Sequence, residues 1–142
     1  MRSAKVILPA FLISLALFNP ALAKEDTGEK KKQEKTKIGV VGAAICKEVK
    51  DLSPVSENEV FRSDVRKLYC FTRVTGANGG DKIKHIWYYQ DKKLAEITLS
   101  IKSPDFRTYS SKKIKAYQKG KWRVEVMSLE GVNLATLNFT IK

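Results

Sequence analysis

The stretch KIKHIWYYQDKKLAEITLSIK, residues 82–102, decides the fold of this chain, because its apolar and polar residues alternate on both sides of a short polar break. In its first half, one face carries Ile83, His85, Trp87 and Tyr89. In its second half, the inward face carries Ala95, Ile97, Leu99 and Ile101. A period of two is typical of β-strands. We therefore expect strands at 82–90 and 94–102, joined as a hairpin by a tight turn at 91–93.

The same alternation continues on both sides of this hairpin. We expect five further strands, at 38–49, 65–75, 106–114, 122–128 and 133–142. Residues 55–64 are expected to form a polar connection with an apolar contact at Val60 and Phe61. About seven short strands separated by turn residues predict an all-β fold, a two-sheet immunoglobulin-like sandwich. A closed barrel is the alternative.

Residues 1–23 have the pattern of a cleavable signal peptide. A positively charged start precedes an apolar run of 13 residues at 6–18, and the small residues Ala21 and Ala23 follow a break at Asn19-Pro20. A helix that spans a bilayer needs roughly 20 apolar residues, so a permanent anchor is the weaker interpretation. We expect a periplasmic or secreted protein with no transmembrane segment after signal cleavage.

The charge of the chain is strongly positive and is not confined to one segment. Residues 24–37, KEDTGEKKKQEKTK, contain six Lys and four acidic residues and no apolar side chain, which predicts a disordered linker. The domain at 38–142 carries 19 basic and 11 acidic residues, a net charge of +8. A basic surface concentrates anions. Outside the cytoplasm these are lipid head groups, acidic glycans, cell-wall polymers and acidic proteins, and nucleic acid is an unlikely partner. The alternative is that scattered charge only aids solubility.

Three motifs in this order resemble a known bacterial family. They are His85-Ile86-Trp87, the RTYSSK run at 107–112 and the GKWRV run at 120–124. Together they resemble the bacterial domain of unknown function numbered 2914, from about Ala43 to Ile141. The resemblance implies a β-sandwich domain of cell-envelope or membrane-attached proteins. It brings no established activity, ligand or catalytic residue.

The best candidate binding residues are basic and aromatic. Seven cations lie within 17 positions that contain no acid: Arg107, Lys112, Lys113, Lys115, Lys119, Lys121 and Arg123. Arg offers a planar fork to a carboxylate or phosphate, and Lys offers a mobile charge. The alternative is a solvated charged loop. Trp87 and Trp122 are expected in the core, whereas Tyr88 faces the other way and could stack on a sugar ring.

Cysteine and histidine are too few to predict a metal or cofactor site. In an exported domain Cys46 and Cys70 are expected to pair as a disulfide if their strands are neighbours, and otherwise to be two small buried thiols. With His85 as the one histidine, they do not complete a four-ligand metal shell. No cofactor is expected.

No residue constellation compels catalysis, so we expect a protein that is not an enzyme. His85 falls on the core side of its strand, and Ser110 shares a strand face with Lys112 without a visible oxyanion-stabilising element. The favoured interpretation is a non-catalytic binding or interaction module of the cell envelope, whose partner is an envelope protein, an anionic glycan or a lipid head group. The alternatives are an accessory domain that recruits a protein by a sheet edge, and a cryptic hydrolase built on Ser110 and Lys112 or on His85.

Overall fold

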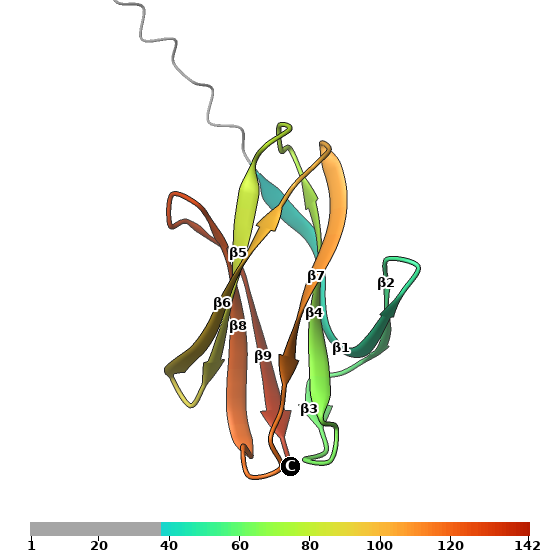
Figure 1. Ribbon diagram of the computed structural model, residues 1–142, viewed down its shortest axis with the longest axis vertical. Helices are drawn as coiled ribbons and strands as arrows, with labels where there is room; N and C mark the ends of the chain where they lie inside the picture. Colours follow the sequence, from blue (N-terminus) through green and yellow to red (C-terminus); the bar gives the residue numbers. More distant parts are fainter. Residues whose placement is uncertain (1–37) are drawn as a thin grey trace, which may run out of the picture. The chain divides into compact units, whose positions relative to one another are not determined.

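The computed structural model describes residues 38–142, and this part of the chain is built from strands alone (Figure 1). The strands are β1 (Gly39–Lys50), β2 (Ser53–Glu57), β3 (Val60–Phe61), β4 (Lys67–Thr75), β5 (Lys82–Tyr89), β6 (Lys92–Ser100), β7 (Asp105–Lys113), β8 (Gly120–Ser128) and β9 (Asn133–Ile141). The expected signal peptide at 1–23 and linker at 24–37 lie outside the described residues. Within 38–142 no helix is long and apolar enough to cross a membrane.

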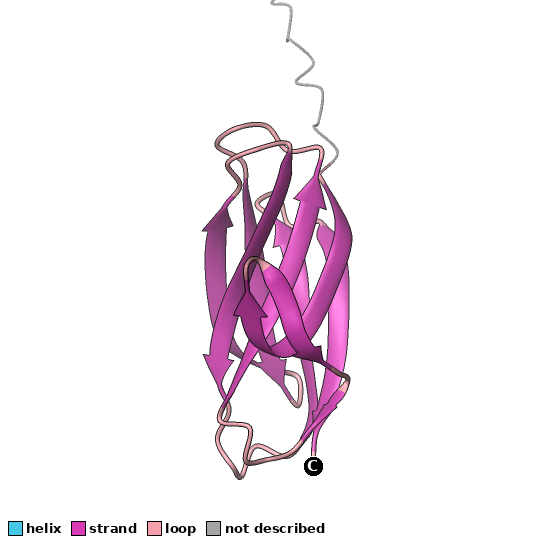
Figure 2. Ribbon diagram, turned by 90° about the vertical axis from the view of Figure 1, so that its right-hand side faces the viewer, coloured by secondary structure: helices cyan, strands magenta, loops and turns pink. Residues whose placement is uncertain are grey.

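The strands form two facing sheets, which confirms the predicted sandwich (Figure 2). The first sheet has the order β2-β1-β4-β7 and the second has the order β3-β9-β8-β5-β6. In immunoglobulin terms, β1-β4-β7 correspond to strands A, B and E, and β9-β8-β5-β6 correspond to G, F, C and C′. Strand β3 pairs in parallel with the end of β9 through Val60 and Thr140.

All seven predicted strands are present, and two more, β2 and β3, lie wholly or partly in the segment 55–64 that was predicted as a polar connection. Strand β2 pairs with β1 through Val55 and Glu48, and β3 pairs with β9. The hairpin of β1 and β2 turns at Asp51 and Leu52, which both have positive φ, of 50° and 53°. Two such residues make the type of turn that joins antiparallel strands. Asp is common at the first of these positions, but Leu52 stands where glycine is usual, so the residues alone did not predict a hairpin here.

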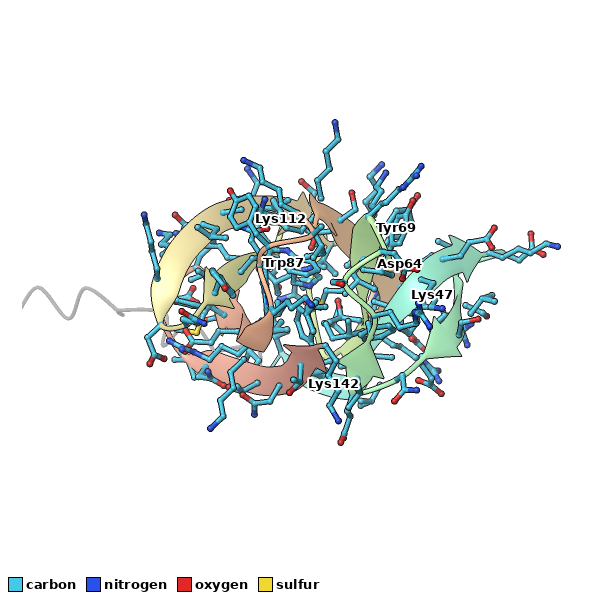
Figure 3. All side chains as sticks on the ribbon, turned by 90° about the horizontal axis from the view of Figure 1, so that it is seen from below. Lys47, Asp64, Tyr69, Trp87, Lys112 and Lys142 are labelled. Carbon is cyan, nitrogen blue, oxygen red and sulfur yellow. The ribbon has the colours of Figure 1, made fainter. Side chains whose placement is uncertain are left out.

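The core lies between the sheets and is centred on three aromatic residues in contact. The rings of Trp122 and Phe139 stack at 5.7 Å between centroids, and Trp87 meets Phe139 edge-on at 6.2 Å. Trp87 is 0% exposed and Trp122 is 2% exposed, so both tryptophans are core residues as predicted. Figure 3 shows Trp87 in the interior and Tyr69 at the outside of the sandwich.

The hairpin of β5 and β6 is present, but its turn is shorter than the predicted 91–93 and begins one residue earlier. Gln90 and Asp91 make the turn, with φ of 46° and 64°, and β6 already begins at Lys92. The register shifts after Trp87, where β6 accommodates one extra residue, Leu94. The early turn places Gln90 and Asp91 at the end of the sheet, beside the start of β8.

Candidate functional site

A cleft of about 500 Å³ opens on the second sheet and gathers four residues that the sequence singled out. These four are Tyr88, Lys121, Trp122 and Arg123. The remaining lining residues are Gln90, Asp91, Gly120 and Asn138. The cleft therefore combines two aromatic residues, two cations, one carboxylate and two amides in one place.

Strand register brings these side chains together. Tyr88 on β5 lies opposite Arg123 on β8, and Arg123 lies opposite Asn138 on β9, so the three form a row across the sheet. Their neighbours Trp87 and Val124 are fully buried. Because side chains alternate between the two faces of a strand, the three side chains of the row point to the outer surface of the sheet. The site thus rests on three adjacent paired strands.

The turn between β5 and β6 forms one end of the cleft. The backbone N–H of Gln90 donates to the carbonyl oxygen of Lys121 at 3.0 Å. Gly120 has a φ of +106°, and a Cβ built there would lie 3.1 Å from Nε2 of Gln90. Glycine therefore serves two purposes at position 120, because it adopts this backbone conformation without strain and leaves room for the Gln90 amide.

Arg123 is fixed in the middle of the cleft. Its guanidinium lies 3.9 Å from the centroid of the Tyr88 ring, and it forms ion pairs with Asp91 and, at 3.2 Å, with Glu125. Desolvation lowers the pKa of Arg123, but the hydrogen bonds to Glu125 and Asp91 outweigh it, and the net effect raises the pKa. The two carboxylates compensate its charge. Its main contribution is a flat, rigid surface stacked on Tyr88.

Lys121 is the cation of this cleft that remains available to a ligand. It is exposed, and within residues 38–142 no carboxylate lies within ion-pair distance of it. Asn138 is exposed as well. An amide can both donate and accept hydrogen bonds, and an ammonium group attracts an anion. The cleft can therefore hold a small polar ligand that carries a negative charge.

The other cations of the predicted basic stretch lie elsewhere. Arg107 and Lys113 point outward from β7 in the first sheet, and Lys112 points toward the opposite face of that strand. Lys115 and Lys119 lie in the connection between β7 and β8. Because the stretch runs along one sheet, crosses over and enters the other sheet, it is continuous in sequence but divided in space.

The one histidine joins the two sheets inside the core. His85 on β5 hydrogen-bonds through Nδ1 to Oγ of Ser110 on β7, at 2.7 Å, and through Nε2 to Oγ1 of Thr72 on β4, at 3.2 Å. Nε1 of Trp87 donates to the same Ser110 oxygen at 3.1 Å. This buried network satisfies each of the four polar side chains.

The network is poorly suited to catalysis although it contains a serine and a histidine in contact. His85 is 0% exposed and Ser110 is 4% exposed, so a substrate has no direct access to either. Burial lowers the pKa of His85 to about 4, which makes it a weak base at neutral pH. Sequence analysis considered Ser110 with Lys112, and His85 separately, but it did not predict the contact between Ser110 and His85. A contact between strands of different sheets leaves no signal in residue spacing.

The expected disulfide between Cys46 and Cys70 is absent, and both thiols are free and buried. Their strands β1 and β4 are neighbours, as a disulfide requires. However, Cys46 lies opposite Tyr69, and Cys70 lies opposite Ile45. Directly opposed residues share a face of the sheet, so the two thiols point to opposite faces. Desolvation is the main cause that raises the pKa of each thiol.

Comparison with known proteins gives a family without an assigned activity. No curated protein matches the chain. Among solved structures, it is similar to "The crystal structure of endonuclease/exonuclease/phosphatase from Beutenbergia cavernae DSM 12333", with 12% sequence identity and a TM-score of 0.31. That similarity covers 72% of this chain and 35% of the other. The family resemblance in the sequence is confirmed, and the match is shorter than the stretch from Ala43 that the resemblance suggested: residues 80–141, from the β4–β5 loop to the end of β9, match the family described as "Protein of unknown function (DUF2914)".

Proposed function

We propose that this domain is a non-catalytic binding module of the cell envelope that holds an acidic sugar unit of an anionic glycan in the cleft of the second sheet. The observation that carries the proposal is the convergence of Tyr88, Lys121 and Arg123 with two amide side chains at one cleft. The signal-peptide pattern at 1–23 supports a location outside the cytoplasm.

The charges of the cleft favour an acidic ligand. Asp91 and Glu125 compensate Arg123, whereas Lys121 has no such partner among the described residues. Lys121 is then the group that binds a carboxylate of the ligand. A neutral ligand would leave this attraction unused, and we therefore expect it to bind more weakly.

The polar groups around Lys121 favour a sugar. Asn138 and Gln90 offer amide donors and acceptors, which suit hydroxyl groups that both donate and accept. Tyr88 adds an aromatic surface beside them, although Arg123 covers one of its faces. The volume of about 500 Å³ falls within the range of small-ligand sites.

Recruitment of a protein by a sheet edge remains the second candidate function, and one observation supports it. Strand β7 is the last strand of its sheet, and its nine residues pair with β4 without a bulge. A regular outer edge can accept an added strand. Lys112 weakens this candidate, since a charged residue that points inward from an edge strand is a common protection against such pairing.

The binding of a trisaccharide of galacturonic acid, measured by calorimetry with the full chain, tests the proposal. We expect binding that weakens with salt, and about tenfold weaker binding by Lys121→Ala. Lys119→Ala is the matched control, because Lys119 is a nearby exposed lysine that does not line the cleft. Equal binding of a neutral trisaccharide of galactose, or equal losses in the two variants, would contradict the proposal.

A further inference from the structure

The outward face of the first sheet forms a second surface, distinct from the cleft. Leu68, Cys70, Thr72 and Val74 of β4 are all 0% exposed, so the residues between them point away from the core. With their partners on β7 they form what we call the basic face. Its members are Lys67, Tyr69, Phe71, Arg73, Arg107, Tyr109, Ser111 and Lys113.

Like charges lie directly opposite each other at both ends of the basic face. Lys67 pairs with Lys113 in register, and Arg73 pairs with Arg107. Directly opposed like charges destabilise a sheet unless something compensates them. Neither pair is explained by the fold, since opposite charges would pair better at these positions.

Only one of the two ends is compensated within the described residues. Asp105 binds Arg73 with both carboxylate oxygens, at 2.8 and 2.5 Å, and these hydrogen bonds lower the pKa of Asp105. At the other end, no carboxylate of residues 38–142 is within ion-pair distance of Lys67 or Lys113. The lysine end therefore has an unmet attraction for an anion.

Three aromatic residues lie between the charged ends, Tyr69, Tyr109 and Phe71, and of these Phe71 is buried, at 7% exposed. Tyr69 and Tyr109 contact each other edge-to-face at 5.9 Å between centroids, and Tyr109 is 44% exposed. Nζ of Lys67 lies 5.0 Å from the centroid of Tyr69. Lys67 and Arg73 are six positions apart on β4, a distance of about 20 Å. The face thus offers two cationic ends that are joined by aromatic surface, over the length of a short extended chain.

We infer that the basic face docks an acidic, extended segment of a partner protein, independently of the glycan proposed for the cleft. Carboxylates of the segment would meet the Lys67–Lys113 pair, and its other side chains would lie against Tyr69 and Tyr109. Tyrosine is favoured at protein interfaces because it contributes contact area at low entropic cost. The positive charge of the basic face requires an acidic partner, and the linear arrangement of its residues along β4 and β7 requires an extended one.

The hairpin of β1 and β2 makes a flat lipid surface the less suitable partner. It stands out from the first sheet beside β4 and β7 (Figure 1). Arg107 reaches this hairpin, since its Nη1 donates to the carbonyl oxygen of Leu52 at 3.4 Å. A planar membrane would meet the projecting hairpin before the tyrosines, whereas a narrow chain can lie alongside it.

Fluorescence anisotropy of a fluorescein-labelled peptide of ten glutamates, titrated with the full chain, tests this inference. Lys113→Glu places an acid opposite Lys67, so we expect at least tenfold weaker peptide binding together with a raised unfolding temperature. Binding that is lost while stability rises cannot be ascribed to misfolding. Lys102→Glu is the matched control, since it changes an exposed lysine outside the basic face by the same charge, and it should bind within twofold of the wild type.

Two further measurements distinguish the basic face from two other binding sites for an acidic ligand, the cleft and a lipid-binding surface. Lys121→Ala should leave peptide binding unchanged, because Lys121 lies in the cleft of the other sheet. Vesicles of phosphatidylglycerol should bind Lys113→Glu and Lys102→Glu equally. The inference is overturned if Lys102→Glu loses the peptide as strongly as Lys113→Glu, or if Lys113→Glu loses the vesicles and keeps the peptide.

Discussion

Mild acid should destabilise this domain through His85 alone. Its pKa is about 4 in the folded protein and 6.5 in an ordinary environment. Between these values the unfolded chain binds a proton that the folded chain does not, so stability falls as pH is lowered. The contribution of His85 to the stability is fully present above pH 6.5 and is lost progressively as the pH falls to about 4. The whole pKa shift of His85 corresponds to about 3 kcal/mol in the free energy of unfolding, and about 2 kcal/mol of this is lost between pH 7 and pH 5.

Urea unfolding followed by tryptophan fluorescence at pH 7, 6 and 5 measures this effect. His85 is the one histidine of the chain, and carboxylates titrate mostly below this window, so the slope belongs to a single group. His85→Gln is the control, because glutamine keeps a donor and an acceptor for Ser110 and Thr72 but does not titrate. We expect it to be less stable than the wild type at pH 7, with a flat profile. A wild-type free energy of unfolding that is the same at pH 7 and pH 5 would refute the reasoning.

Two other predictions concern the backbone and the thiols. Gly120→Ala should lower the free energy of unfolding by about 1–2 kcal/mol, because alanine is strained at a φ of +106° and crowds Gln90. Gly79→Ala is the control and should lower it less, because Gly79 lies in open space. Urea unfolding of both variants measures the difference. A reductant should leave the unfolding temperature unchanged, and a thiol reagent should modify Cys46 and Cys70 only after unfolding. A clear fall in that temperature on reduction would show that a disulfide forms.

The strands were predictable because their signal is local. Alternation along residues 82–102 depends only on neighbouring residues, and the structure keeps the predicted inward face, which includes His85 and Trp87. Strand β2 was missed because its turn has Leu52, and not glycine, at the second position of positive φ. Local sequence thus predicts a strand well and a turn only when the turn has its typical residues.

The site was only partly predictable because it depends on register between strands. Tyr88, Lys121 and Arg123 could each be chosen by residue type, but their meeting with Asn138 requires the pairing of β5, β8 and β9. Register also determines whether Cys46 and Cys70 share a face of the sheet and can form a disulfide. A change of one residue in the pairing reverses the face to which every side chain of a strand points. Neither relation can be derived from the spacing of residues along one chain.

The hydrogen bonds of His85 have a mechanical consequence. Apolar contacts between two sheets are non-directional and permit small sliding movements, whereas hydrogen bonds require a defined geometry. Because His85 bonds Thr72 and Ser110 of the opposite sheet, the two layers are held in one alignment. The cleft and the basic face lie on the two outer surfaces of this unit, with a packed interior about 10 Å thick between them. With the glycan proposed for the cleft and the protein segment proposed for the basic face, such a domain would act as a rigid spacer between the two ligands.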